Sequence, residues 1–222
     1  MQLIGMLDSP YVRRVAVSLQ LLGLAFEHRS LSVFRQFDEF ARINPVVKAP
    51  TLVCDDGAVL MDSNLIIDYA EALAQARRAK RRSLLPAALA ERQRCLQLTG
   101  VALAVCEKSV QLYYELGLRP SEKQHAVWVD RVQHQLGTAL ATLEAALADA
   151  PLACTSAAID QAGVSCAVAW HFVRAMQPEL AGVAQHPALQ AHSEHAEQLA
   201  EFRHAPHGDG TVTAGAEGRT TA

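Results

Sequence analysis

The stretch LIGMLDSPYV, residues 3–12, decides how the start of this chain folds. An apolar run opens it, which favours a short buried strand, and an amphipathic helical pattern begins at Tyr11. Pro10 suits the first turn of a helix, because the N–H that proline lacks would have no partner there. Ser9 therefore lies where unsatisfied backbone N–H groups meet the positive end of a helix dipole. Such a position stabilises an anion such as a thiolate, although helix capping alone also accounts for a serine there.

Composition and charge narrow the class of protein. The chain has 222 residues, half of them hydrophobic, which suffices for one large domain or two modest ones. A net charge of −3 implies no general attraction to nucleic acid or to an anionic membrane. The five cysteines are scattered without metal-type spacing, and we find neither a signal peptide nor a membrane span. We expect a cytoplasmic protein with reduced thiols and no nucleic-acid or membrane partner.

The first 75 residues alternate between strand and helix patterns. An Asp-Gly turn at 56–57 joins the last two strands into a hairpin. A strand, a crossover helix and a second strand imply a right-handed parallel unit at the start. Together these patterns predict an α/β, thioredoxin-like domain of order β-α-β-α-β-β-α, with strands over 2–7, 26–31, 51–54 and 58–61 and helices over 11–22, 34–43 and 64–73.

The rest of the chain reads as an all-helical domain over residues 87–203. A linker over 76–86 precedes it, and the arginine-rich run at 77–82 is interpreted as a solvated connection. A capping box at Ser121–Gln124 predicts where the second long helix starts, and Asp160 is a candidate cap for the next helix, which should be the buried centre. The segment 204–222 has no periodicity, which predicts a disordered tail.

Two further motifs are candidates for ligand binding. In Asn44-Pro45-x-x-Lys48-Ala49-Pro50, a proline directly before a strand is compatible with a cis bond, which would offer the N–H and C=O of Ala49 to an extended peptide. An ordinary proline turn is the alternative. In Asp62-Ser63, a carboxylate and a helix start suit the ammonium and carboxylate of a free amino acid. Capping by Ser63 alone is the alternative there.

In order and spacing, these motifs resemble the cytosolic glutathione transferases of the serine type, with their thioredoxin-like and helical domains. The resemblance is most specific from Ser9-Pro10 to Asp62-Ser63. It implies that Ser9 is the catalytic hydroxyl that serves the glutathione thiol and that Ala49 pairs with the cysteinyl backbone. It also implies that Asp62 and Ser63 hold the γ-glutamyl head. Lys48 would lie near the glycyl carboxylate, with Arg35 as a weaker second candidate.

The resemblance further implies glutathione as co-substrate, no metal and a homodimer. The expected activity is conjugation of the glutathione thiolate to small, largely apolar electrophiles, as in detoxification. Two alternatives stay open: a non-catalytic relative that binds ligands or proteins, and a glutathione-dependent isomerase or peroxidase. Tyr11 is the rival catalytic hydroxyl, and a carboxylate at Asp8 would raise the pKa of a nearby thiol. The pair His192 and His195 shares one helical face but lacks a third metal ligand.

Overall fold

A computed structural model describes residues 1–77 and 82–213 of the chain. The chain divides into two compact units. The first unit contains residues up to Ser83 together with the chain from Gln198 onward, and the second runs from Leu84 to Glu197. The predicted linker at 76–86 does not match this division, because α3 continues to Arg77 and Leu84 is already fully buried. Part of that linker, residues 78–81, lies outside the described residues.

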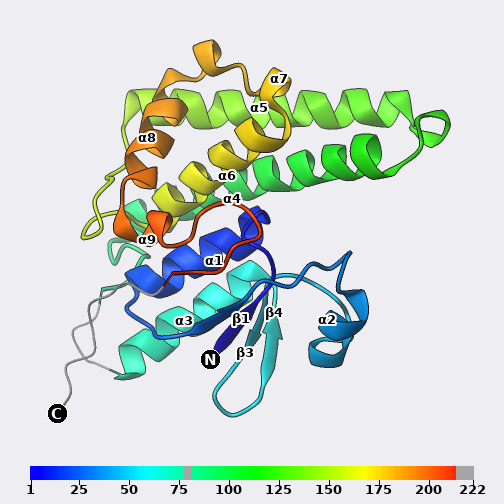
Figure 1. Ribbon diagram of the computed structural model, residues 1–222. Helices are drawn as coiled ribbons and strands as arrows, with labels where there is room; N and C mark the ends of the chain where they lie inside the picture. The colour runs from blue at the N-terminus through cyan, green and yellow to red at the C-terminus, as the bar shows by residue number, and fades with distance from the viewer. Residues whose placement is uncertain (78–81, 214–222) are drawn as a thin grey trace. The chain divides into compact units, whose positions relative to one another are not determined.

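The first unit is built on a mixed sheet of strand order β2-β1-β3-β4 (Figure 1). Strand β1 pairs in parallel with β2 and antiparallel with β3, which pairs antiparallel with β4. The predicted order β-α-β-α-β-β-α is confirmed, although each strand is shorter than its sequence pattern. The elements are β1 (Gln2–Ile4), α1 (Pro10–Leu21), β2 (Glu27–Arg29), α2 (Phe37–Ile43), β3 (Thr51–Val53), β4 (Val59–Met61) and α3 (Ser63–Arg77).

Side-chain alternation in β1 explains how the helices cover the sheet. Ile4 is fully buried in a cluster with Leu31 and with Phe40 of α2. Successive strand residues point to opposite faces, so the equally buried Leu3 faces the other side. Helices α1 and α3 pack against each other on that side.

Gly5 allows the segment after β1 to approach its neighbours closely. Its φ of +134° lies in a region that residues with a side chain rarely adopt. A β-carbon there would lie 2.7 Å from Cγ2 of Val12 and 3.0 Å from Cβ of Ala49. The absence of a side chain therefore lets the start of α1 and the segment around Ala49 come together.

The second unit is helical. Burial along nearly all of α6 confirms that this helix is the centre of the unit, and Oδ1 of Asp160 accepts from the Gly163 N–H at 2.9 Å as its cap. No helix among the described residues is long and apolar enough to cross a membrane. The elements are α4 (Leu89–Leu112), a π-helical turn η1 (Tyr113–Leu118), a 3₁₀ turn η2 (Ser121–Lys123), α5 (Ala126–Asp149), α6 (Gln161–Met176), α7 (Pro178–Ala181), η3 (Val183–Gln185) and α8 (Pro187–Glu197).

The start of α5 differs from the expectation. The predicted capping box at Ser121 forms only the short turn η2, and α5 begins at Ala126. The cap is His125, whose Nδ1 accepts from the Trp128 N–H at 3.3 Å. Histidine is not among the residues preferred at this position, so the sequence pattern favoured the serine.

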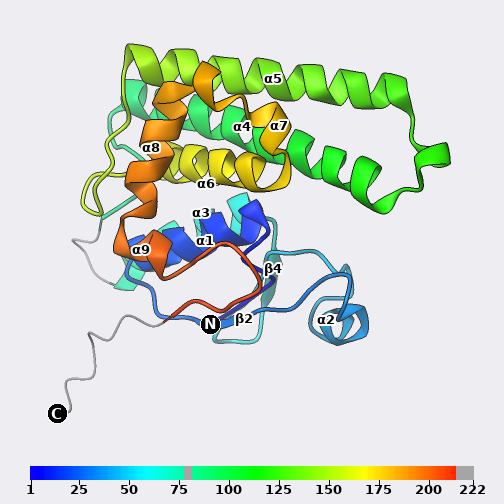
Figure 2. The same cartoon turned by 45° about the horizontal axis from the view of Figure 1, so that its top comes forward.

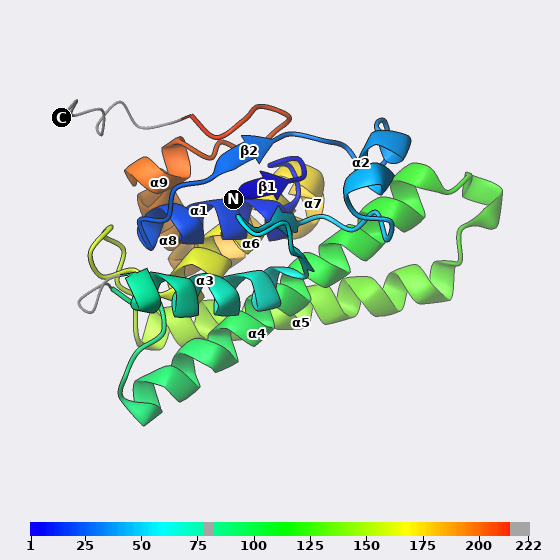
Figure 3. The ribbon, with the colours of Figure 1, turned by 90° about the horizontal axis from the view of Figure 1, so that it is seen from below.

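The chain after α9 (Ala200–Arg203) also differs from the expectation of a disordered tail. Residues 204–213 have an irregular but defined path beside β2 (Figures 2 and 3). Arg13 Nε donates to the Ala205 C=O at 2.8 Å, and the Arg13 guanidinium lies over the Phe202 ring. A segment without periodicity is thus held by contacts that are distant in sequence. Residues 214–222 lie outside the described part of the chain.

Two buried histidines make the stability of the chain depend on pH. Burial lowers the pKa of His28 and of His192 below the ordinary value of 6.5, and backbone carbonyls of Gly5 and Gly163 oppose this shift only in part. Between the lowered pKa values and pH 6.5, the unfolded chain therefore binds more protons than the folded chain. We expect stability to be greatest above about pH 6.5 and to fall as the pH drops through the lowered pKa values.

Urea unfolding at pH 7.5 and at pH 5.5 measures this dependence. The free energy of unfolding should be smaller at pH 5.5, and His28→Gln or His192→Gln should each reduce the difference. A difference that neither substitution changes would assign the acid sensitivity to other groups.

Candidate functional site

The start of α1 presents Ser9 as predicted by the sequence. Ser9 is the N-cap, with φ −72° and ψ 122°, and Pro10 follows in the first turn. The Ser9 Oγ accepts from the Val12 N–H over a long distance of 3.5 Å, and Ser9 is half-buried. A hydroxyl can accept with a lone pair while its hydrogen donates elsewhere. Capping and donation to a bound anion are therefore compatible at Ser9.

Asp8 adds negative charge beside this helix start. Its side chain is half-buried, and burial raises the pKa of its carboxyl. The Ser9 N–H lowers that pKa, Asp209 raises it and Arg35 lowers it again. A charged residue from the C-terminal segment thus acts electrostatically on the α1 start.

The segment before β3 carries the second motif. The Ala49–Pro50 bond is cis. Within the described part of the chain, the N–H and C=O of Ala49 have no hydrogen-bond partner. Because Ala49 packs against Gly5, this backbone edge lies close to the segment that leads into α1. The Lys48 C=O accepts from the Thr51 hydroxyl at 2.7 Å, whereas the exposed Lys48 ammonium has no hydrogen-bond or ion-pair partner among the described residues.

The start of α3 excludes the alternative in which Ser63 serves as the helix cap. Oδ1 of Asp62 accepts from the Asn64 N–H at 2.9 Å, so Asp62 caps the helix and Ser63 does not. Asp62 has a φ of 73°, which is rare for a residue with a side chain. The buried Ser63 hydroxyl instead accepts from Nη1 of Arg14 at 2.9 Å. The hydroxyl is thus fixed in place by a cation rather than used as a cap.

Arg14 is a site-forming residue that sequence reasoning missed. Its side chain is 2% exposed, and Nη1 also donates to Oδ1 of Asn64 at 2.8 Å. Arg14 therefore connects α1, which carries Ser9, with the start of α3. The available signal was a pair of arginines, Arg13 and Arg14, among the apolar residues of an amphipathic helix, because a buried charge requires a partner.

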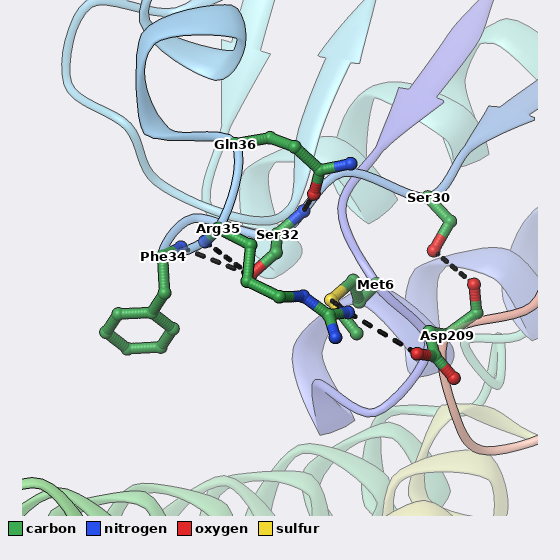
Figure 4. Close-up of polar contacts among 7 residues, drawn as sticks. All are labelled: Met6, Ser30, Ser32, Phe34, Arg35, Gln36 and Asp209. Carbon is green, nitrogen blue, oxygen red and sulfur yellow. Dashed lines mark hydrogen bonds and ion pairs between the residues drawn. The ribbon is translucent and has the colours of Figure 1, made fainter.

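Arg35 lies in the loop between β2 and α2, next to the α1 start (Figure 4). Ser32 shapes this loop, since its Oγ accepts from the N–H groups of Phe34 and Arg35, both at 3.2 Å. Nη2 of Arg35 lies 3.5 Å from Sδ of Met6 and 3.4 Å from Oδ2 of Asp209. Arg35 is thus a cation at this site that is already engaged by a carboxylate.

The other candidates lie in the second unit. His192 is buried, and its Nε2 donates to the Gly163 C=O at 2.9 Å. Among the described residues, no three His, Cys, Asp or Glu side chains gather as metal ligands would.

Architecture and motifs together define a thioredoxin-like protein with an added helical unit. Residues 3–78 match the family model described as "Glutathione S-transferase, N-terminal domain". A glutathione transferase family member from Pseudomonas fluorescens Pf-5, solved with bound S-(propanoic acid)-glutathione, is 31% identical. The match covers 91% of this chain and 97% of that one, with a TM-score of 0.73. This chain therefore belongs to the glutathione transferase family.

A second structure of the same Pf-5 protein and one further relative agree with this assignment. The Pf-5 protein solved with bound glutathione is 30% identical with a TM-score of 0.74, over 91% of this chain and 96% of that one. The uncharacterized GST-like protein YibF of Escherichia coli K12 is 26% identical over 178 residues. That match covers 80% of this chain and 85% of YibF.

Proposed function

We propose that this protein is a glutathione transferase that joins the glutathione sulfur to small, largely apolar electrophiles. The observation that carries the proposal is the pair of helix starts in one unit, Ser9 on α1 and Ser63 on α3, connected by Arg14. Helix starts favour anions, and glutathione offers a thiolate and a γ-glutamyl carboxylate. The glutathione compounds bound in the two structures of the Pseudomonas relative support this ligand.

In the proposed complex, each part of glutathione meets a chemically matching group. The γ-glutamyl carboxylate accepts from the Ser63 hydroxyl, and the ammonium pairs with the Asp62 oxygen that is not used in capping. The cysteinyl backbone pairs with Ala49, as an added strand would. Lys48 and Arg35 take the glycyl carboxylate. None of these contacts requires a metal ion.

Catalysis in this proposal consists of stabilising the sulfur anion. The thiol releases its proton to solvent, and the Ser9 hydroxyl donates to the thiolate. The sulfur lone pair then forms a bond to the electrophilic carbon, and a leaving group departs with the electrons of the bond that breaks. A hydrogen bond to a charged partner contributes about 1.5–3 kcal/mol.

The family resemblance also supports a homodimer, a cytoplasmic location and a role in detoxification.

Ultraviolet titration of the protein–glutathione complex tests the catalytic part of the proposal. A thiolate absorption band at neutral pH is expected, because Ser9 lowers the pKa of the bound thiol. Intact glutathione binding without such a band would favour the non-catalytic ligand-binding alternative.

The γ-glutamyl head should provide most of the affinity for glutathione. We expect cysteinylglycine, which lacks this head, to bind much more weakly in calorimetry. Ser63→Ala should weaken glutathione binding by about 1–3 kcal/mol, because a hydrogen bond to a charged group is lost.

The matched control for Ser63→Ala is Ser18→Ala. Ser18 is also buried and also touches Arg14, but its Oγ donates to the Arg14 backbone C=O. Ser18→Ala should change stability without changing affinity. Equal affinities for glutathione and cysteinylglycine would remove Asp62 and Ser63 from the binding site.

A further inference from the structure

Residues 204–213 form a loop, which we call the C-terminal loop, fastened to the first unit. The Thr213 N–H donates to the His204 C=O at 2.9 Å and closes the loop. The Val212 N–H donates to Nδ1 of His28 on β2 at 3.1 Å. Ser30 Oγ donates to the backbone C=O of Asp209 at 2.7 Å. These contacts hold Asp209 beside the end of β2.

His28 connects this loop with the segment that leads to Ser9. Its Nε2 lies 2.7 Å from the Gly5 C=O and must donate, because a carbonyl only accepts. Nδ1 therefore accepts from Val212 in the neutral ring. One imidazole thus joins the C-terminal loop to the β1–α1 connection.

The Asp209 side chain meets Arg35 at this place (Figure 4). Oδ2 of Asp209 lies 3.4 Å from Nη2 of Arg35, and the two side chains are 71% and 65% exposed. Asp209 also raises the pKa of Asp8, next to Ser9. A carboxylate of the chain itself therefore lies against a cation of the candidate site.

Arginine is well suited to bind carboxylates, since its planar guanidinium offers several donors. A ligand carboxylate that approaches Arg35 must share these donors with Asp209 or displace Asp209. The negative charge of Asp209 also repels the ligand carboxylate. An ion pair this exposed is weak, so displacement is easy. The pair therefore lowers affinity for an incoming carboxylate without closing the site.

We propose that Asp209 is a specificity-determining residue that competes with the glycyl carboxylate of glutathione for Arg35. This inference rests on the proposed function, because it requires glutathione to bind with its glycyl end toward Arg35. The C-terminal loop then tunes the affinity for ligands according to the charge at that end.

Calorimetry with glutathione and with its glycyl monoethyl ester, which lacks that negative charge, tests the proposal. Asp209→Asn should tighten glutathione binding about two- to fivefold, the range expected for an exposed ion pair, and leave ester binding unchanged. In an Arg35→Gln background the gain should vanish, as a double-mutant cycle requires for two coupled groups. Asp55→Asn is the matched control, because Asp55 is an exposed carboxylate of the same unit that pairs with Arg77 and the N-terminus. Asp55→Asn should change neither the affinity for glutathione nor the affinity for the ester.

The other outcomes separate the two proposals. Unchanged glutathione binding in Asp209→Asn, or an equal gain for acid and ester, would overturn the competition at Arg35. A gain that persists in the Arg35→Gln background would also overturn it. If neither the natural protein nor the variant binds glutathione, the proposed function itself fails.

Discussion

Ser9→Ala is expected to lower turnover with a chloronitrobenzene roughly 10- to 150-fold, while the affinity for glutathione changes little. The factor corresponds to losing one hydrogen bond to a charged group, expressed fully in the transition state. The neutral thiol of the ground state needs this bond far less than the thiolate does, so the loss appears in kcat rather than in KM. The pKa of the bound thiol should rise, which shifts the pH–rate profile to higher pH.

The capping role of Ser9 must be separated from this effect. Loss of the cap costs about 1 kcal/mol of stability, which urea unfolding measures independently of turnover. If Ser9→Ala keeps full turnover and an unmoved pH profile, Ser9 serves only as a cap. Tyr11→Phe then becomes the substitution to test, because Tyr11 is the rival hydroxyl in the first turn of α1.

Arg14→Lys is expected to weaken glutathione binding about tenfold or more, with kcat little changed at saturating glutathione. One guanidinium nitrogen holds both Ser63 and Asn64, and a lysine ammonium cannot reproduce the planar geometry of that guanidinium. Misplacing the Ser63 hydroxyl costs a hydrogen bond to the ligand carboxylate, and each 1.4 kcal/mol is tenfold in affinity. The expected effect lies in KM, the opposite of Ser9→Ala, and cysteinylglycine binding should be unaffected.

The neighbouring Arg13 provides the control for Arg14→Lys. Both arginines are almost completely buried in α1, but Arg13 contacts Phe202 in α9 and Ala205 just after it. Arg13→Lys should reduce the free energy of unfolding by a similar amount without changing the affinity for glutathione. Equal losses of affinity in both variants would mean that Arg14 acts only through stability.

The order of elements in the first unit followed from local pattern. Apolar runs, the Asp-Gly turn and Pro10 each restrict the backbone within a few residues, so periodicity was sufficient to predict them. The burial of α6 was predictable for the same reason, because its apolar residues surround the helix. The strands are shorter than their patterns, because a sequence pattern does not mark the residue at which pairing with the neighbouring strand ends.

The parts that sequence did not predict depend on contacts between distant residues. The Ser63 hydroxyl accepts a hydrogen bond from Arg14, which lies 49 residues away in the sequence. The path of residues 204–213 depends on side chains of the first 30 residues, and no local periodicity encodes such contacts. The glutathione-binding roles of all six predicted site residues stay predictions that the experiments above address: Ser9, Arg35, Lys48, Ala49, Asp62 and Ser63.

The fastening of the C-terminal segment to the first unit has a consequence for synthesis. Arg13 emerges from the ribosome early, but its acceptor Ala205 and its ring partner Phe202 emerge only after the whole helical unit has been made. At ordinary elongation rates this interval is on the order of ten seconds. During that time the nascent thioredoxin-like unit carries a guanidinium that still lacks these two partners. The unit that stands first in the sequence is therefore the last to be completed.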